Sequence, residues 1–170
     1  MVRTTKVVVA AIAVALAALV VAAPSSAATT LNVNATFTEQ FGGPMHSPFT
    51  CASGDLCGTG TAAGLGRISE SIVFGGGCGG GCDLRTITFA DGSTLVLEES
   101  EGDTVCPGNS DCRTFNDHSY GNPFSIPLTD TVNGALSTGV FAGASGTLTG
   151  QVMVAGGVAQ IGLSGPVTLA

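Results

Sequence analysis

Hydrophobic and polar residues alternate along most of this chain from about residue 31 onward. In the stretch 31–41, LNVNATFTEQF, the apolar side chains of Leu31, Val33, Ala35, Phe37 and Phe41 fall on one side, and asparagine, threonine and glutamine residues fall on the other. Side chains point alternately to the two faces of a β-strand, so this pattern predicts a strand with one dry face and one wet face.

The same alternation recurs in six more segments, which are 61–74, 84–89, 94–99, 123–132, 147–154 and 158–169. Asp91 and Gly92 lie between two of these segments and predict a tight hairpin turn. Loops are expected from the end of the first strand to about Gly60, and over the acidic, turn-rich stretch 98–122. Pro127 has no backbone N–H, so it predicts an edge strand or an irregular one.

No amphipathic helix is predicted after residue 28, and the stretch 137–146, STGVFAGASG, is expected to be a bend around Phe141. Many short alternating strands at close spacing are typical of an all-β barrel or sandwich. The predicted class is therefore all-β and antiparallel.

The first 28 residues differ from the rest of the chain. Two cations, Arg3 and Lys6, precede an uncharged run from Val7 to Ala23, and small residues follow Pro24. This layout is that of a secretory signal peptide with a small-x-small cleavage site. We expect residues 1–27 to be a signal peptide and residues 28–170 to form a single domain of a secreted protein. The alternative is a retained membrane anchor, although the apolar run is at the short edge of a span.

Removal of the signal peptide makes the chain strongly acidic. Three arginines, Arg67, Arg85 and Arg113, remain against twelve aspartates and glutamates, which gives a net charge of −9. Nucleic-acid and anionic-lipid partners are disfavoured, because both need clustered lysines or arginines.

Six cysteines fall into three local pairs, in the segments CASGDLC, CGGGC and CPGNSDC. An even count in an exported chain predicts disulfides, and six cysteines allow fifteen connectivities. Local pairing is favoured because glycine, serine, proline and asparagine let each short loop turn back on itself. Zinc is disfavoured by the spacing, and thiol exchange by the absence of C-x-x-C. No metal or cofactor is predicted, and the predicted disulfide cysteines are Cys51, Cys57, Cys78, Cys82, Cys106 and Cys112.

Four segments carry a family resemblance: LGRIS, FADGSTLVL, TGVFAGASGTLTGQV and IGLSGPVTL, in this order. They resemble exported actinobacterial proteins of unknown function, and the third segment is similar to a glycine-rich motif of the plant dirigent and allene oxide cyclase families. The resemblance covers residues 61–169. It implies a closed antiparallel β-barrel, to which the cysteine pairs add disulfide-linked loops, and it transfers no catalytic residue, because shared fold does not imply shared activity.

Glu70 is the candidate ligand-binding residue. Simple alternation places it on the same face as Ile68 and Ile72, where a buried carboxylate has a raised pKa and can bind a polar ligand atom. The alternative is a bulge near Gly64 or Gly66, or an inverted face, that leaves Glu70 in water. Isolated charges within strands are mostly exposed, so the exposed placement is favoured.

Other candidates are weaker. His46 and His118 lie in predicted loops without a recognisable nucleophile, and Ser145 in GASG does not match the G-x-S-x-G elbow. The acids at 98, 99, 101 and 103 have the oxygen ligands that calcium prefers, but no D-x-D-x-D-G loop is present, so a solvated charge run is favoured.

These patterns favour a secreted, non-enzymatic β-barrel that binds a small ligand or has an extracellular structural role. The alternative is an isomerase or cyclase that acts on a small apolar molecule inside the barrel, where holding the substrate's shape needs few polar groups. An open interior cavity with Glu70 pointing into it favours the enzyme, and a packed interior disfavours it.

Overall fold

A computed structural model of the chain describes residues 28–40, 56–105, 124–155 and 158–170. The predicted signal peptide, residues 1–27, lies outside the described residues. Within the described residues no helix is long and apolar enough to cross a membrane.

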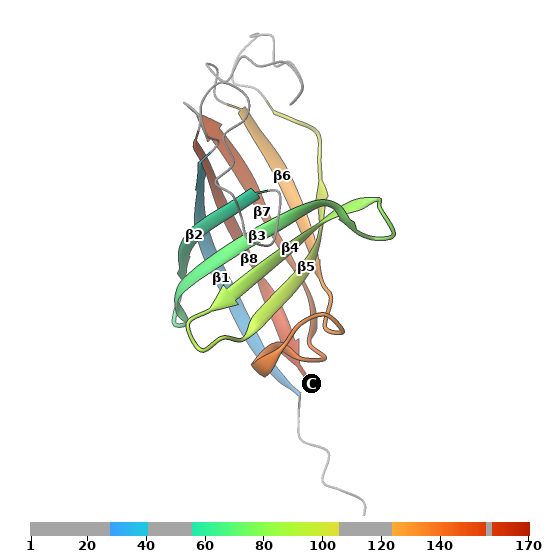
Figure 1. The fold of residues 1–170 in the computed structure, drawn as a ribbon. Helices are drawn as coiled ribbons and strands as arrows, with labels where there is room; N and C mark the ends of the chain where they lie inside the picture. Colours follow the sequence, from blue (N-terminus) through green and yellow to red (C-terminus); the bar gives the residue numbers. More distant parts are fainter. Residues whose placement is uncertain (1–27, 41–55, 106–123, 156–157) are drawn as a thin grey trace, which may run out of the picture.

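The described residues form one closed antiparallel barrel, shown in Figure 1. Each strand pairs with the next along the chain, and β8 closes the barrel against β1 in an unbroken register from Thr29↔Leu169 to Gln40↔Val158. The predicted all-β antiparallel barrel is confirmed. Its strands are β1 (Thr29–Gln40), β2 (Leu56–Ala62), β3 (Gly66–Gly77), β4 (Cys82–Phe89), β5 (Thr94–Glu101), β6 (Phe124–Val132), β7 (Ser145–Ala155) and β8 (Val158–Leu169).

The alternating apolar side chains fill the barrel. Strand β1 buries Val33, Ala35 and Phe37 while the residues between them are exposed, and strands β6 to β8 repeat the pattern. Because inward and outward positions alternate along every strand, one hydrophobic phase per strand is enough to build a single core. Figure 1 shows β2 to β5 crossing obliquely in front of β1 and β6 to β8.

A short 3₁₀ helix, η1 (Gly139–Phe141), packs against strand β5 near one end of the barrel, where the sequence predicted a bend. The ring of Phe141 is buried, with its centroid 4.7 Å from that of Phe89. Gly139 has φ +61, and a Cβ there would overlap the Ser93 side chain, so this tight approach requires glycine.

Strand β2 is the element that the sequence did not predict, because a loop was expected up to Gly60. Its inward positions are Leu56, Gly58, Gly60 and Ala62, and the two glycines interrupt the alternation of apolar side chains that marks the other strands. A Cβ at Gly60 would overlap the carbonyl oxygen of Thr36 on the neighbouring strand β1. Close approach of two strand backbones therefore explains a glycine that resembled a turn residue.

Pro127 lies in β6, which pairs with β5 on one side and β7 on the other, so of the two expectations, an edge strand or an irregular one, the edge strand is wrong. The carbonyl of Pro127 accepts a hydrogen bond from the N–H of Gly102, just past the last β5–β6 register pair, Glu101↔Leu128. Pro127, which has no N–H, therefore lies where the β5–β6 hydrogen-bond ladder ends. On its other side β6 pairs with β7 through Pro127↔Gln151 without a gap.

Candidate functional site

A buried arginine lies inside the barrel and contacts three carboxylates. Arg85, on β4, is 1% exposed. Its Nε donates to Glu99 Oε2 at 2.6 Å, and its Nη1 donates to Glu70 Oε2 and, at 3.4 Å, to Glu39 Oε1. The three carboxylates come from β5, β3 and β1, so one guanidinium joins side chains from four strands of the barrel.

A fourth carboxyl completes this group. Asp130, on β6, is fully buried and lies directly opposite Glu99 in the β5–β6 register. Burial of a charge is unfavourable unless the charge is paired, and here one guanidinium faces four acids. We call this group the buried charge cluster, and its members are Glu39, Glu70, Arg85, Glu99 and Asp130.

Three buried carboxyl oxygens in the cluster have no hydrogen-bond donor among the described residues. They are Oε1 of Glu70 and both oxygens of Asp130. Each has a neighbouring carboxyl with which one proton can be shared: a neutral Glu39 donates to Glu70, and a neutral Asp130 donates to Glu99. Protons therefore supply the donors that the protein's own N–H and O–H groups do not.

The pKa values in the cluster reflect this crowding. Burial, followed by repulsion from Glu70, raises the pKa of Glu39 from 4.5 to about 8. Burial, followed by repulsion from Glu99, raises the pKa of Asp130 from 3.8 to about 8. Burial also raises the pKa of Glu70, although the charge of Arg85 opposes it. Burial alone would lower the pKa of Arg85, but Glu70 and Glu99 outweigh it and hold the guanidinium charged.

The surroundings of the cluster are filled by the barrel's own atoms. A Cβ on Gly58 would lie 2.5 Å from Glu70 Oε1 and 3.0 Å from Cγ of Glu39, so glycine at this position of β2 makes room for the two carboxyls. The Phe37 ring centroid lies 5.9 Å from Cζ of Arg85, within the range of a cation–π contact.

The exposed placement favoured for Glu70 from the sequence is therefore wrong: Glu70 is 4% exposed and faces inward. Its burial is made possible by Arg85, which no local pattern around Glu70 reveals. A signal was nevertheless present, because each charged residue stands at a position where the strand's alternation calls for an apolar one. Asp130, for example, lies between Leu128 and Val132 in the buried phase of β6.

A second candidate site is a hollow of about 1290 Å³ on the outer face of the barrel. It extends over strands β7, β8, β1, β2 and the start of β3, and we call it the outer groove. A Cβ on Gly162 would meet nothing within 4 Å, so this outward position leaves the groove open. The polar side chains that line it are Asn34, Thr36, Thr38, Thr59, Thr61, Arg67, Thr149, Gln151, Gln160 and Ser164.

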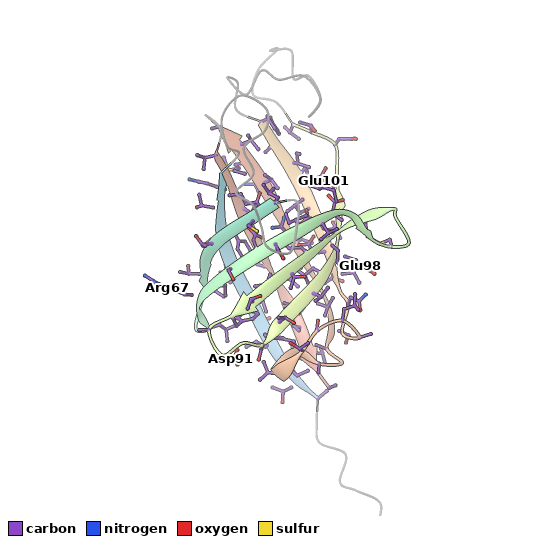
Figure 2. All side chains as sticks on the ribbon, viewed as in Figure 1. Arg67, Asp91, Glu98 and Glu101 are labelled. Carbon is purple, nitrogen blue, oxygen red and sulfur yellow. A yellow bond between two sulfur atoms is a disulfide. The ribbon has the colours of Figure 1, made fainter. Side chains whose placement is uncertain are left out.

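Arg67 lies at the edge of this groove and points away from the barrel, as Figure 2 shows. It is exposed, whereas Arg85, the other arginine among the described residues, is buried. The outer groove therefore has one positive charge in an otherwise uncharged lining of hydroxyl, amide and apolar side chains.

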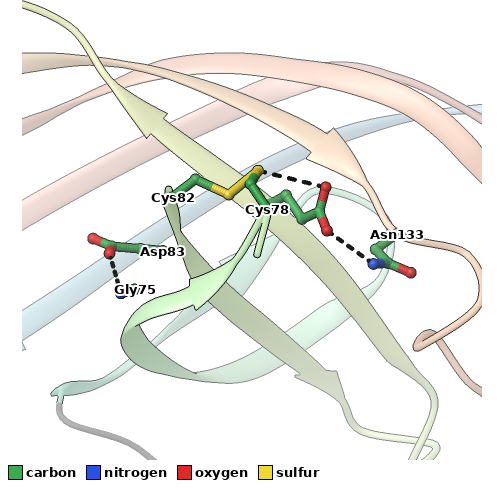
Figure 3. Close-up of a disulfide and its surroundings, with 6 residues drawn as sticks. Gly75, Cys78, Cys82, Asp83 and Asn133 are labelled. Carbon is green, nitrogen blue, oxygen red and sulfur yellow. Dashed lines mark hydrogen bonds between the residues drawn. A yellow bond between two sulfur atoms is a disulfide. The ribbon is translucent and has the colours of Figure 1, made fainter. Parts of the chain in front are cut away.

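The predicted clip between Cys78 and Cys82 is present, with Cα atoms 5.4 Å apart (Figure 3). Gly79 and Gly80 of the enclosed loop have positive φ, as a tight turn of this kind requires. Cys57 is also disulfide-bonded. The other predicted disulfide cysteines, Cys51, Cys106 and Cys112, and the two histidines, His46 and His118, lie outside the described residues.

Searches of protein-family models, of curated proteins and of solved structures found no match to this chain.

Proposed function

We propose that this protein is a secreted, non-enzymatic β-barrel that binds a polyhydroxylated small ligand, such as a short oligosaccharide, in the outer groove. The observation that carries the proposal is the groove itself, a hollow of about 1290 Å³ whose lining combines many hydroxyl and amide side chains with a few apolar ones, such as the exposed Met153. Its volume is somewhat above the roughly 300–1,000 Å³ of ordinary small-ligand sites, which leaves room for a ligand of several sugar units.

The chemistry of the groove matches such a ligand. Threonine and serine hydroxyls and the amides of asparagine and glutamine both donate and accept hydrogen bonds. Sugar hydroxyls do the same, so a regular array of these side chains satisfies a chain of sugar units. Arg67 at the edge favours a ligand that carries a carboxylate, because the guanidinium binds carboxylates through two parallel hydrogen bonds.

The close packing of the barrel interior favours a ligand site on the outside of the barrel. A cavity large enough for a substrate would leave its lining side chains accessible to a water-sized sphere, yet Ile87, Leu95 and Leu97 are 0% exposed. The polar part of the interior is filled by the buried charge cluster. A small apolar ligand or substrate, expected from the sequence if the interior is open, would have to displace these side chains.

The same packing bears on the isomerase or cyclase alternative. Glu39 has a pKa suited to acid–base chemistry near neutral pH. Its Oε1 is already hydrogen-bonded to Arg85, and a general acid or base must come within hydrogen-bond reach of a substrate proton. We therefore favour binding over catalysis.

A titration followed by nuclear magnetic resonance tests the proposal. The probes are cellopentaose, chitopentaose and trigalacturonate, which differ in amide and carboxylate content. The proposal predicts amide shift changes confined to β7, β8, β1 and β2, with the strongest binding for trigalacturonate. Changes confined to the buried strand positions around Glu70, or no change with any probe, would overturn it.

A groove-filling variant makes the test sharper. Gly162→Phe places a ring in the open floor of the groove at a position without positive φ, so the barrel should fold and binding should fall at least tenfold. Thr131→Phe is the matched control, because Thr131 is exposed on the outer face of β6, away from the groove. Equal binding by the two variants would place the ligand elsewhere.

A further inference from the structure

The disulfide at the tip of the β3–β4 hairpin joins an exposed cysteine to a buried one. Cys78 is exposed, whereas Cys82, the first residue of β4, is 8% exposed. A Cβ on Gly77 would lie 2.8 Å from Sγ of Cys82, so glycine at this position makes room for the buried sulfur. A molecule in solution therefore reaches the disulfide from the Cys78 side.

The backbone at Cys78 is strained. Its φ is +49, and it is the one residue other than glycine with positive φ in the described part of the chain. A Cβ disfavours this left-handed conformation, which persists only where the surrounding structure imposes it. Here the disulfide closes a ring of five residues around the turn. Opening the ring removes this restraint, so the strain favours the reduced form.

A carboxylate lies beside the exposed sulfur. Oε2 of Glu98 is 3.7 Å from Sγ of Cys78, and Oε1 of Glu98 accepts a hydrogen bond from Nδ2 of Asn133 at 3.1 Å. A disulfide sulfur carries no proton, so Oε2 gains no hydrogen bond from it. The S–H of a reduced Cys78 in the same place would donate to Oε2. Glu98 therefore favours the reduced form, because this bond exists in that state alone.

The barrel does not depend on this disulfide. A ring of five residues closes little chain, so the disulfide contributes little stability through loop entropy. Strands β3 and β4 are already paired below the tip, from Ile68↔Phe89 to Val73↔Leu84. Reduction should therefore leave the barrel folded. The spacing of the two cysteines disfavoured thiol exchange, but exposure, backbone strain and the position of Glu98 cannot be read from spacing.

The charge around the disulfide is negative. Asp83 follows Cys82 directly, and its Oδ1 accepts the N–H of Gly75 at 2.7 Å. Figure 3 shows Asp83 and Asn133, the partner of Glu98, on opposite sides of the disulfide. A unit charge about 6 Å from one carboxylate in water changes its local concentration about threefold, so opposite charges differ about tenfold.

We propose that the Cys78–Cys82 disulfide is an exchange site for small thiols that carry a positive charge. The thiolate of a first thiol attacks Sγ of Cys78, the bond between the two cysteines breaks, and Sγ of Cys82 leaves with the electron pair and takes up a proton. A second thiolate attacks the sulfur of the bound thiol, and Cys78 leaves and takes up a proton. Two thiols are thus oxidised to one disulfide, and the protein is reduced to a dithiol. This site is on the β3–β4 hairpin, and the proposal does not rest on the outer groove.

Reduction of the full chain by two probes tests the proposal. Cysteamine carries an ammonium group and mercaptoethanesulfonate a sulfonate, and the two are compared at equal thiolate concentration and low ionic strength. Alkylation followed by peptide mass spectrometry measures the loss of the Cys78–Cys82 bond, and amide spectra show whether the barrel stays folded. We expect reduction in the folded state, about tenfold faster with cysteamine. A bond that is reduced only after urea unfolds the barrel, or equal rates with both probes, would overturn the proposal.

Variants of two glutamates on β5 test the part played by Glu98. Glu98→Gln should lower the preference for cysteamine at least threefold, and in cysteamine–cystamine mixtures it should shift the equilibrium at least threefold toward the disulfide. Glu101→Gln is the matched control, because it removes the same charge three residues further along β5, at an exposed position. Equal effects of the two variants would show that general charge, and not the contact with Cys78, controls the exchange, and would overturn the assignment of Glu98.

Discussion

Replacement of Arg85 by methionine should destabilise the barrel far more at pH 8 than at pH 5. The guanidinium is 1% exposed and pairs with three carboxylates that are themselves almost fully buried. Breaking a buried ion pair by removal of one partner costs about 3–5 kcal/mol, because it leaves an uncompensated charge. A carboxylate that loses Arg85 can avoid this penalty by taking up a proton.

The size of the penalty then depends on pH. Holding a carboxyl neutral when its unfolded pKa is 4.5 costs about 5 kcal/mol at pH 8 and about 1 kcal/mol at pH 5. Arg85→Met should therefore lose about 4 kcal/mol more at pH 8 than at pH 5 for each carboxyl that becomes neutral.

Urea unfolding at the two pH values measures this difference in the free energy of unfolding. Arg67→Met is the control, since it removes the same charged group from an exposed position and should change stability by less than about 1 kcal/mol at either pH. A loss for Arg85→Met that is equal at pH 5 and pH 8, or below about 1 kcal/mol at both, would refute the assignment of Arg85 as the counter-ion of the cluster.

Three further variants probe the interior and the clip. Burial raises the pKa of Glu39 in the folded state, so the stability that its protonated form contributes is complete below about pH 4.5 and is lost as pH rises through about 8. Glu39→Gln should therefore reduce the slope of the free energy of unfolding against pH between these values by up to about 1.4 kcal/mol per pH unit. Urea unfolding at a series of pH values measures this slope. Gly58→Ala should destabilise by about 1–3 kcal/mol through overlap with Glu70, whereas Gly162→Ala, in open space, should be tolerated; equal melting temperatures would contradict this. Cys78→Ser opens a five-residue ring and should lower the free energy of unfolding by at most about 2 kcal/mol, so a failure of the variant to fold would show that the disulfide does more than close a local loop.

The strand pattern and the class of the fold could be predicted from alternation alone, because each long strand buries one phase of its side chains. Strand β2 could not, since its inward residues include Gly58 and Gly60, and these glycines are there for the neighbouring backbone and carboxyls. Glycine that relieves close packing and glycine that permits a turn are identical in sequence.

The candidate site was only partly predictable. Glu70 could be singled out by its phase, but its burial depends on Arg85, whose nearest register partner in β3 is Ile72. Reading every charged residue against the phase of its own strand would have identified the whole cluster, including Glu39 and Asp130. The outer groove depends on how five strands curve together, and no local pattern records that curvature.

The titration with trigalacturonate, followed through the backbone amides of the protein, tests the proposed function most directly. The proposal predicts saturable shift changes at Thr36 and Gln151 that are lost in Gly162→Phe and kept in Thr131→Phe. Shift changes centred on Ile87 and Glu70 would instead place the ligand inside the barrel and contradict the assignment of the outer groove as the binding site.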